Sequence, residues 1–521
     1  MDTLLNKIGS KVNSIITGFD RIVFKGIIRP IMYAAGMESF LVSKKVRNKD
    51  FKAYAMEQSQ KIVKSAETIA SEQCDSGVTY IRSLNERKEA LAHNRQKERG
   101  VEEGLIGVWS CVESCSTFRS TYNPMQAYPS LRNERSKCKH LYFYFDDPVY
   151  GFMSVRLQTW APYEIQISLN GREWLRRSLD TVGCGYVVKG NKFLHIDDYS
   201  LAQRFLDEQI KTDFTEVLNG FLPFVFPRMP EVLGNRLSYY WTFWQSEIAK
   251  DYIFKDSNTL GTLMDDFQLY ALITGTGERI LKYFGSPVKL DGQPLQISNP
   301  EIRSYTSNWY GGLRVRHWNN KNSVKFYNEH NVLRFEMTMN DPSKFKIHRH
   351  AEGQNKTEPK KLMLIRKGVA DTVARAEVSK NIIDRFTEHM SAVEEKTRLG
   401  ELLAPVSVPL KRKGKKIRAL DVFGKDMDFL RVVSDPGFNI SGITNKGLQT
   451  MLAGTPWAKH MSGKQLSGRI SRHLRLLRDH GLIRKLPNQW KYILTDKGRK
   501  ITAAIDAARS ASVNDLLKSA A

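Results

Sequence analysis

The sequence predicts an α+β protein, in which a body of mixed or antiparallel sheet precedes a C-terminal domain of helices and one β-hairpin. Two β-rich blocks, 105–169 and 313–339, alternate apolar and polar residues as half-buried strands do. In the first block, strands are predicted at 105–109, 140–145, 152–159 and 163–169. Strands grouped in blocks, and not alternating singly with helices, favour an α+β fold. Apolar residues at helical spacing mark helices around these blocks, at 51–72, 85–99, 200–218, 260–282 and 377–396.

The C-terminal domain is predicted from residues 462–500. Its first half carries leucine and isoleucine at helical spacing, which gives a helix with one apolar face. Gly481 stands where a helix ends, and two short strands follow, separated by a turn at Pro487-Asn488. A helix followed by a two-stranded wing is typical of a winged helix-turn-helix. The apolar face is formed by Leu466, Ile470, Leu474 and Leu477.

The same segment is strongly basic, which suits a helix in the DNA major groove with a wing on the flanking phosphates. A solvated face on a protein-contact domain is the alternative interpretation. The predicted DNA contacts are Lys464, Arg469, Arg472, Arg475, Arg478, Arg484, Lys485 and Lys491.

Composition divides the chain into four parts. Residues 1–185 form an N-terminal α+β region with a β-meander, and residues 186–400 form a second α+β region. Prolines followed by a run of Lys and Arg mark 401–424 as a basic linker. Residues 425–521 form the predicted winged helix-turn-helix domain.

The charge of the chain favours a polyanionic partner. The formal net charge is +25, and residues 401–521 hold 23 Lys and Arg against 9 Asp and Glu, a net +14. We expect duplex DNA at the wing and single-stranded DNA at the body. RNA is an alternative partner for the body, with bases stacked on Tyr142, Tyr144 or Trp160, although such aromatics more often belong to the core.

Hydropathy argues against a membrane protein. No run of 18 apolar residues occurs, and the N-terminal segment lacks a continuous apolar stretch with a cleavage site. We therefore expect no membrane partner and a cytoplasmic location. The sequence leaves the oligomeric state open.

Three of the five cysteines cluster in the sequence with one histidine. Cys111, Cys115, Cys138 and His140 offer thiolate and imidazole ligands that suit a tetrahedral zinc site. Their spacing is looser than that of common zinc motifs, so ordinary buried thiols are the alternative. Five cysteines in so long a chain do not indicate a disulfide framework.

Two acids four residues apart suggest a different metal site. Glu247 and Asp251 share one face whether their segment is a strand or a helix. Paired carboxylates bind hard cations such as Mg²⁺ or Mn²⁺ through oxygen. Two solvated acids are the alternative.

A hairpin at 323–337 places further chemistry near such a site. One register presents Lys325 and Tyr327 on one strand with Arg334 and Glu336 on the next. Basic side chains hold a phosphate, an acid holds a metal, and a tyrosine attacks phosphorus.

Residues 241–340 resemble plasmid and phage rolling-circle replication initiators. The resemblance rests on Ser246–Asp251, Lys325-Phe326-Tyr327 and Arg334-Phe335-Glu336. It implies metal-dependent DNA nicking, with Glu247, Asp251 and Glu336 as metal ligands. A tyrosine nucleophile is also implied. Tyr327 and Tyr310 are the candidates, because the strand where the family usually carries its tyrosine has none; Tyr305 is a poorer candidate.

The whole chain also resembles a widespread group of uncharacterised bacterial proteins with a C-terminal domain compared with MarR-type regulators. The matching residues are Asp20-Arg21, Thr159-Trp160-Ala161-Pro162 and Asn170-Gly171-Arg172, together with the C-terminal segment. Asp20 is a candidate third acid beside Glu247 and Glu336.

We therefore predict a DNA-binding, replication-initiator-like protein of a mobile element, with metal-dependent nicking through a tyrosine as its strongest form. A non-enzymatic winged-helix transcriptional regulator and an RNA-binding protein are the alternatives.

Overall fold

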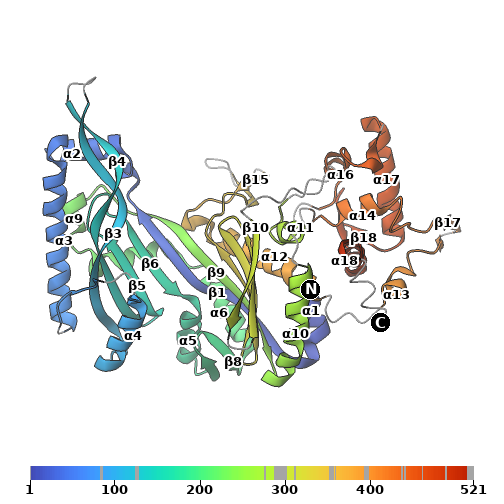
Figure 1. The fold of residues 1–521 in the computed structure, drawn as a ribbon, viewed down its shortest axis with the longest axis horizontal. Coiled ribbons are helices and arrows are strands. Elements are labelled where there is room, and N and C mark those ends of the chain that lie inside the picture. The colour runs from blue at the N-terminus through green and yellow to red at the C-terminus, as the bar shows by residue number, and fades with distance from the viewer. Residues whose placement is uncertain are drawn as a thin grey trace. The chain divides into compact units, whose positions relative to one another are not determined.

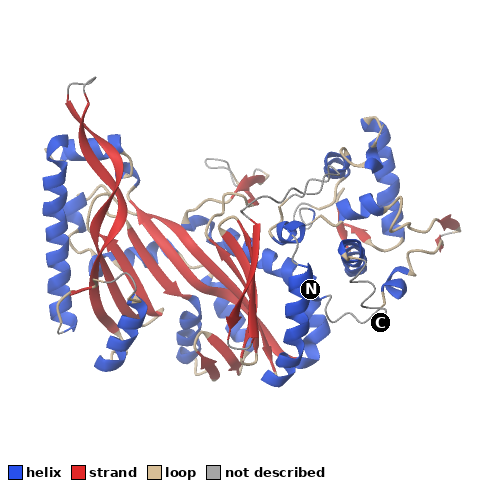
Figure 2. Cartoon of the chain, in the orientation of Figure 1, coloured by secondary structure: helices blue, strands red, loops and turns tan. Residues whose placement is uncertain are grey.

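The computed structural model divides the chain into two units, and each is described by itself (Figures 1 and 2). The large-sheet unit comprises Ile15–Asp251 and Thr338–Lys380, and the C-terminal unit comprises Met1–Ser14, Tyr252–Met337 and Asn381–Ala521. The structure describes residues 2–74, 76–82, 86–123, 128–274, 277–286, 302–309, 312–350, 357, 359–391, 398–412, 414–435, 438, 442–459, 461–486 and 490–512.

A mixed sheet forms the frame of the large-sheet unit. Its strand order is β9-β1-β6-β5-β4-β3-β2, and the pairs from β1 to β3 are antiparallel while β2 runs parallel to β3. The strands are β1 (Val12–Ile27), β2 (Thr79–Tyr80), β3 (Gly104–Asn123), β4 (Tyr128–Asp147), β5 (Gly151–Gln158), β6 (Ile165–Asn170) and β9 (Tyr240–Phe254).

The two faces of this sheet differ in polarity because successive side chains alternate. Ile165, Ile167 and Leu169 of β6 are buried on one face. On the other face a polar row crosses five strands, since residues directly opposite in antiparallel pairs lie on the same side. That row is Lys25, Gln166, Arg156, Tyr142 and Trp109.

Helices cover parts of both faces. On β3, α3 (Phe51–Cys74) packs through Phe51 against Phe118, and α4 (Lys88–Arg99) covers Trp109 and Tyr144. The remaining helices that lie wholly in this unit are α2 (Ala34–Ser43), α5 (Gly171–Thr181), α6 (Tyr199–Gln209), α7 (Phe214–Gly220), α8 (Leu222–Val225) and α9 (Met229–Leu233). Two small hairpins complete it, β7 (Tyr186–Lys189) with β8 (Lys192–Ile196) and β14 (Lys346–Arg349) with β15 (Lys361–Leu364).

The C-terminal unit begins with an antiparallel meander. Its strands are β10 (Ile302–Trp309), β11 (Gly312–Asn319), β12 (Asn322–Glu329) and β13 (Val332–Met339), adjacent in that order. The division between the units falls within β1, β9 and β13. Helices of this part are α1 (Thr3–Ile8), α10 (Ser257–Thr274), α11 (Gly277–Tyr283) and the second half of α12 (Thr372–Met390).

The last part of the C-terminal unit has its own apolar core. In chain order it contains α13 (Leu399–Leu403), β16 (Leu410–Arg412), β17 (Lys415–Ile417), α14 (Met427–Val433), α16 (Asn445–Leu452), α17 (Gly463–Asp479), β18 (Ile483–Lys485), β19 (Tyr492–Leu494) and α18 (Asp496–Ser510). The segment 401–424, which the sequence suggests is a linker, contributes to this core. Its charge run lies on the β16–β17 hairpin, while Leu403, Val406, Leu420 and Val422 are buried with the helices.

These helices agree with the sequence-based pattern. Leu466, Ile470, Leu474 and Leu477 are buried on α17, whose first turn is held by a capping box between Ser462 and Gln465. β18 and β19 pair antiparallel, and the predicted turn at Pro487-Asn488 lies outside the described residues. An α+β fold is confirmed. None of the described helices is long and apolar enough to span a membrane.

A buried acid stabilises this part of the chain. Both carboxylate oxygens of Asp426 accept hydrogen bonds at 2.6 Å from the guanidinium of Arg418, and Oδ2 also accepts from the backbone N–H of Asp421 at 2.9 Å. Nε2 of His473 lies 3.3 Å from Oδ1. Burial alone raises the pKa of Asp426, but these hydrogen bonds outweigh it and hold the pKa well below its usual range.

We expect Asp426→Asn to lower the free energy of unfolding by about 2 to 3 kcal/mol, somewhat less than for a fully buried pair because Arg418 keeps access to water. The folded-state pKa is depressed, so this stabilisation is present above the ordinary aspartate pKa of about 4 and is lost as pH falls through the folded value. Urea unfolding at neutral and acidic pH measures both effects. Asp428→Asn, on the first turn of α14, is the matched control and should cost less than about 1 kcal/mol. Equal losses in the two variants would contradict the assignment.

Candidate nucleic-acid interface

A cavity of about 340 Å³ lies on the large-sheet unit. It is lined by residues of β1, β5, β6, β9, α4 and the turn between β7 and β8. We call it the acidic cavity, and the lining residues used below are Asp20, Arg21, Glu89, Asn191 and Glu247. Arg21 and Glu89 form an exposed ion pair at 3.4 Å at its rim.

Two carboxylates meet in the acidic cavity. Asp20 of β1 and Glu247 of β9 each offer an oxygen within 4.8 Å of the other. Oδ1 of Asp20 accepts a hydrogen bond at 2.7 Å from Nδ2 of Asn191, and Oε1 of Glu247 accepts one at 2.5 Å from Nε2 of Gln245. Two negative charges this close repel unless a cation offsets them. One oxygen of each carboxylate is thus oriented by an amide donor.

The buried guanidinium of Arg172 lies beside Asp20, on the side away from the cavity. Nη2 of Arg172 lies 3.0 Å from Oδ2 of Asp251 and donates to the carbonyl of Ala249 at 2.9 Å. Its Nε lies 3.7 Å from Oδ1 of Asp20. Arg172 and Asp251 each expose only 1% of the side chain, so water screens this ion pair little.

Local sequence places Arg172 at this point. The side chain of Asn170 caps the first turn of α5 by accepting from the N–H groups of Arg172 and Glu173. Gly171 lies so close to β1 that a Cβ there would stand 2.3 Å from the carbonyl oxygen of Phe19. Only glycine therefore allows α5 to start against β1 and to direct Arg172 toward Asp20.

Glu247 and Asp251 both lie on strand β9, one of the two geometries that the sequence allows. The carboxylate of Asp251 pairs with Arg172, and it is Asp20 that accompanies Glu247 in the cavity. A ligand role for Asp251 stays a prediction. Glu336 belongs to the C-terminal unit, and its role as a metal ligand also stays a prediction.

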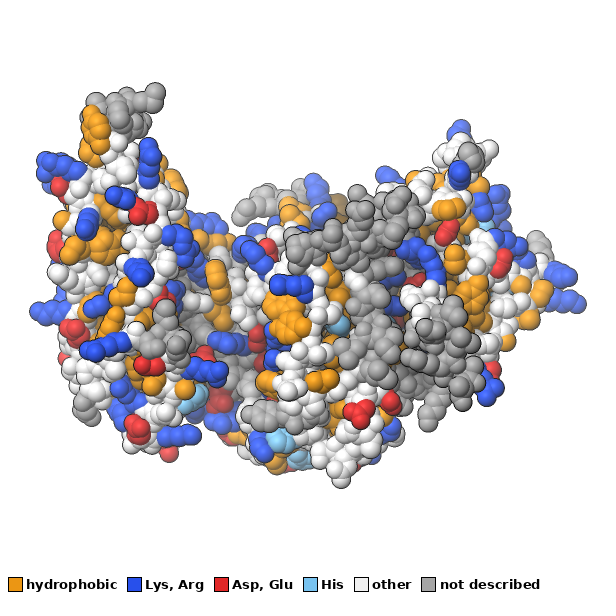
Figure 3. Space-filling model, in the orientation of Figure 1, with side chains coloured by type: hydrophobic (Ala, Val, Ile, Leu, Met, Phe, Trp, Pro, Cys, Tyr) orange, Lys and Arg blue, Asp and Glu red, His pale blue; other side chains and the backbone are white. Residues whose placement is uncertain are grey.

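A second cavity, of about 260 Å³, carries positive charge on the same strands β1, β5 and β6. We call it the basic groove and define it by Lys25, Arg135, Arg156 and Trp244. Nζ of Lys25 lies 2.7 Å from Glu164 and 5.4 Å from the ring centre of Trp244. Trp244 is 55% exposed. Gln158 and Gln166 also line it. Figure 3 shows Lys and Arg side chains spread over the visible face of this unit.

Arg156 of the basic groove forms an ion pair with Glu113, which also contacts three neighbouring side chains. Its carboxylate lies 2.9 Å from both Lys88 and Arg156 and accepts hydrogen bonds from Tyr142 at 2.7 Å and from Cys111 at 3.2 Å. Burial alone raises the pKa of Glu113, but the hydrogen bonds and positive charges hold it well below its usual range. Burial and the neighbouring Glu113 raise the pKa of the Cys111 thiol to about 11, so this thiol stays protonated.

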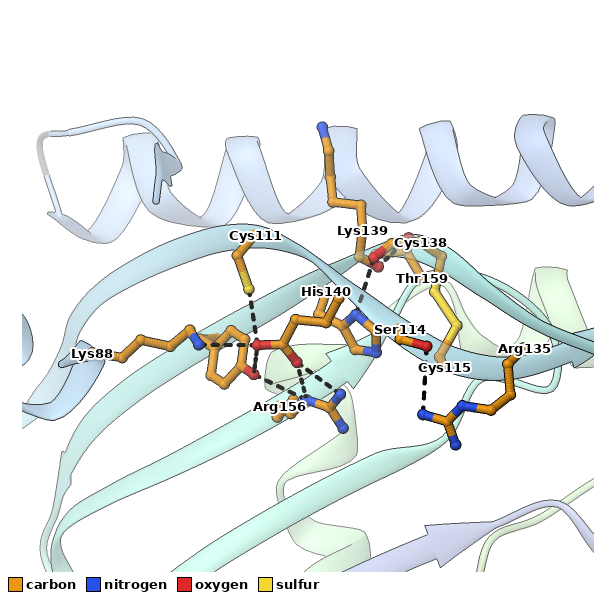
Figure 4. Close-up of polar contacts among 12 residues, drawn as sticks. Lys88, Cys111, Ser114, Cys115, Arg135, Cys138, Lys139, His140, Arg156 and Thr159 are labelled. Carbon is orange, nitrogen blue, oxygen red and sulfur yellow. Dashed lines mark hydrogen bonds and ion pairs between the residues drawn. A yellow bond between two sulfur atoms is a disulfide. The ribbon is translucent and has the colours of Figure 1, made fainter. Parts of the chain in front are cut away.

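The cysteine–histidine cluster is only partly the one predicted. Cys115, Cys138 and His140 each place a ligand atom within 4.8 Å of the others, whereas the sulfur of Cys111 faces Glu113. Cys115 and Cys138 form a disulfide, and sulfurs bonded to each other are not thiolate ligands (Figure 4). The expectation of ordinary thiols is therefore wrong for these two cysteines, and a zinc site is not confirmed.

In the C-terminal unit, the hairpin of β12 and β13 brings together two predicted catalytic residues, Lys325 and Tyr327, and the predicted metal ligand Glu336. Nζ of Lys325 lies 2.5 Å from Oε1 of Glu336, and the hydroxyl of Tyr327 donates to Oε2 at 3.4 Å. All three are buried, as is Arg334. The catalytic role of Lys325 and Tyr327 and the metal-ligand role of Glu336 stay predictions.

The other tyrosines differ in accessibility. Tyr310 lies outside the described residues. Tyr305 on β10 is 44% exposed and accepts a hydrogen bond at 3.3 Å from Arg316. Burial raises its pKa, but the charges of Arg316 and Arg314 and the hydrogen bonds from Arg316 and Trp318 together outweigh burial and leave the pKa below its ordinary value. Tyr305, which the sequence ranks low, is therefore an accessible and comparatively acidic hydroxyl.

Most of the predicted DNA contacts are free of the core. Lys464, Arg472, Arg475 and Arg478 are exposed on α17, and Arg484 and Lys485 are exposed on β18. Arg469 instead packs over the ring of Trp457 at 4.1 Å and donates to its carbonyl. Lys491 is half-buried, and Trp490 beside it is 87% exposed with Lys485 4.3 Å from its ring centre.

Two of the three aromatics considered for base stacking, Tyr142 and Tyr144, have other partners, while Trp160 is half-buried. Tyr144 is buried beneath α4, and Tyr142 donates to Glu113. Comparison with protein-family models, curated proteins and solved structures found no match. Both sequence resemblances therefore stay predictions.

Sequence reasoning missed three residues of this interface. Trp244 is an exposed aromatic inside a strand of apolar residues, which is a usable signal. Asn191 had only the local signal of a turn residue, Gly190-Asn191 between β7 and β8. The contact of Arg172 with Asp20 joins residues 152 positions apart, and no pattern in one sequence reveals that pairing.

Proposed function

We propose that this chain is a DNA-processing protein that cleaves a phosphodiester with a divalent cation held by Asp20 and Glu247. The observation that carries the proposal is the close pair of carboxylates in the acidic cavity, on the same strands as the basic groove. A replication-initiator-like protein of a mobile element is the role that this chemistry and the sequence resemblance favour together.

The donor set suits Mg²⁺ or Mn²⁺. These cations prefer oxygen ligands and, at phosphate-processing sites, use one or two carboxylates together with substrate phosphate oxygens. Asp20 and Glu247 supply the two carboxylates. The carboxylate of Asp20 is held in position by a hydrogen bond from Asn191 and by the nearby guanidinium of Arg172. A bound cation would polarise the scissile phosphate and offset the charge that develops on it.

The basic groove suits a single strand. Lys25, Arg135 and Arg156 provide positive charge for the backbone, and the exposed face of Trp244 provides a surface for one base. The amide of Gln166 adds a hydrogen-bonding group to the same wall, whereas the buried amide of Gln158 donates to backbone carbonyls. Stacking and charge without a base-specific pocket favour binding that tolerates many sequences.

Cleavage needs a nucleophile that bonds to phosphorus while the bond to the leaving oxygen breaks and that oxygen takes up a proton. Water and a tyrosine hydroxyl are the two candidates, and only a tyrosine leaves a covalent phosphotyrosine link. Tyr327 donates its proton toward Glu336, a suitable acceptor, while Tyr305 combines exposure with a lowered pKa.

The C-terminal helices fit a winged helix-turn-helix that binds duplex DNA. In this interpretation α17 enters the major groove with Lys464, Arg472, Arg475 and Arg478, and the β18–β19 hairpin is the wing. Duplex binding here would select the locus, and the large-sheet unit would act on the strand.

Two alternatives differ in outcome. A non-enzymatic regulator needs the winged helix but not Glu247 or Glu336. An RNA-binding protein needs the basic groove but no duplex site. Crosslinking followed by sequencing of the bound nucleic acid separates these three functions.

We expect supercoiled DNA carrying the protein's own locus to be nicked in the presence of Mn²⁺, and Glu247→Gln to abolish the nicking. The same substitution should lower Mn²⁺ affinity at least about 10-fold, because it removes one ligand charge, and Asn191→Ala should lower it roughly 10- to 100-fold. Calorimetry measures binding, and gel electrophoresis measures nicking.

Glu89→Gln is the matched control, since Glu89 lines the same cavity but is exposed and paired with Arg21. It should leave both measurements unchanged. Unaltered Mn²⁺ binding in Glu247→Gln would contradict the metal site, and loss of a covalent adduct in Tyr327→Phe or Tyr305→Phe would identify the nucleophile.

We expect Trp244→Ala to weaken binding of single-stranded oligonucleotides by about 1 to 3 kcal/mol, because one stacked base loses its surface. Fluorescence anisotropy at fixed salt measures this change. Val187→Ala, an exposed apolar residue of β7 outside the groove, is the control. Equal affinities for wild type and Trp244→Ala would exclude the groove as the binding surface.

We expect the double substitution Arg472→Ala and Arg475→Ala to weaken duplex DNA binding and to reduce the salt slope by about 2, one unit for each lost phosphate contact. If either residue reads a base, discrimination between sites also falls by about 1 to 3 kcal/mol. Arg509→Ala, at an exposed basic residue of α18, should leave the slope unchanged. The same slope in the double variant would contradict the role of α17.

A further inference from the structure

Three potential metal ligands share one face of the β3–β4 pair. Cys115 lies on β3, while Cys138 and His140 lie two residues apart on β4 and so point to the same side, with Lys139 turned away (Figure 4). The register pairs Glu113 with Cys138 and Cys111 with His140, which places Cys115 diagonal to Cys138. One ligand atom from each lies within 4.8 Å of the other two.

His140 is held in the orientation of a metal ligand. Its Nδ1 lies 3.1 Å from the carbonyl oxygen of Cys138, and a carbonyl only accepts, so Nδ1 carries the proton and Nε2 carries the lone pair. The ring is fully buried, and within the described part of the chain Nε2 has no hydrogen-bond partner. Imidazole ligands of metals commonly donate their other N–H to a backbone carbonyl in this way.

A buried acceptor without a partner is costly, and ordinary core packing does not account for it. The disulfide sulfurs are poor donors to Nε2 because they carry no hydrogen. Reduction to thiols changes the chemistry, since two thiolates and one imidazole form the ligand set that selects zinc.

We propose that Cys115, Cys138 and His140 form a redox-controlled site for a thiophilic divalent cation such as Zn²⁺, which is closed when the two cysteines form their disulfide and open when they are reduced. The ligand geometry is compatible with this exchange. Tetrahedral zinc with ordinary bond lengths holds its ligand atoms about 3.5 to 3.8 Å apart, so side-chain rotation on the fixed strands suffices.

The surroundings favour thiolates at this pair of cysteines. Arg135 and Arg156 line the basic groove together with Cys115. Nearby positive charge stabilises thiolates. Cys115 also lines the basic groove, so ions and reductants reach the cluster from solvent. Three protein ligands leave a fourth position, which water from the groove fills.

The exchange balances with a dithiol reductant. A dithiol transfers two electrons and two protons to the Cys115–Cys138 bond, which breaks to give two thiols, and the reductant becomes a disulfide. Binding of Zn²⁺ then releases the two thiol protons. A disulfide oxidant reverses the exchange: it accepts two electrons from the two thiolates and takes up two protons to become a dithiol, while the Cys115–Cys138 bond forms again and Zn²⁺ is released.

The test uses the full-length protein, reduced with a dithiol under anaerobic conditions and titrated with Co²⁺ as a spectroscopic substitute for Zn²⁺. We expect one equivalent to bind with the charge-transfer absorption of cobalt–thiolate bonds, and the oxidised protein to show none. Cys115→Ser and Cys138→Ser should each reduce this absorption strongly, and His140→Gln should weaken the affinity.

Cys111→Ser and Cys184→Ser are the matched controls and should keep the full absorption, because Cys111 faces Glu113 and Cys184 is on another segment. Alkylation followed by mass spectrometry is an independent readout, in which Zn²⁺ should protect Cys115 and Cys138 but not Cys184. Absence of thiolate absorption in the reduced wild type, or its loss in Cys111→Ser, would overturn the proposed ligand set. Because Mn²⁺ prefers carboxylates, failure of this site leaves the Mn²⁺ result for Asp20 and Glu247 unaffected.

Discussion

The buried guanidinium of Arg172 constrains the acidic cavity, because it contacts Asp20 and Asp251 from inside the large-sheet unit. Removing such a charge from water costs several kcal/mol, which only close countercharges and hydrogen bonds offset. Nη2 of Arg172 contacts the carboxylate of Asp251 and the carbonyl of Ala249. Nε of Arg172 lies near the carboxylate of Asp20. These contacts join β1, the start of α5 and β9, so the positions of the carboxylates follow from the fold.

The same three charged groups explain why the cavity is acidic. One guanidinium faces two carboxylates, which leaves one negative charge among Arg172, Asp251 and Asp20. Asp251 is the more deeply buried partner at 3.0 Å, whereas Asp20 is at 3.7 Å and lines the cavity. Asp20 therefore brings its carboxylate to the wall of the cavity, where Glu247 adds a second carboxylate. Two acids thus meet in one place on a strongly basic chain, and this meeting is the ground for the proposed cation site.

Periodicity predicted the order of helices and strands well, but it underestimated β3 and β4. The sequence suggested strands at 105–109 and near 140–145, while the structure extends them to Gly104–Asn123 and Tyr128–Asp147. Glu113 explains why the predicted strand was shorter than β3. In the sequence a charged residue at this position suggests a loop, whereas in the structure Glu113 is half-buried and pairs with Lys88 and Arg156. Patterns of hydrophobicity miss a strand whose polar face is satisfied by ion pairs. Residues close in sequence, such as Lys325 and Tyr327, were easier to place than the distant pair of Asp20 and Arg172.

The two ligand sets of the large-sheet unit differ in hardness, and this difference assigns them different cations. Asp20 and Glu247 offer oxygen, which suits Mg²⁺ and Mn²⁺, while Cys115, Cys138 and His140 offer sulfur and nitrogen, which suit Zn²⁺. Carboxylates do not change with the redox conditions, so the proposed oxygen site keeps its ligands. The proposed sulfur site has thiolate ligands only after the Cys115–Cys138 disulfide is reduced. Since Cys115 lines the basic groove, a cation bound there would add positive charge beside the surface that is proposed to hold a phosphate backbone. Taken together, the two proposals imply that reduction strengthens binding of the strand without altering the carboxylates proposed to act on it.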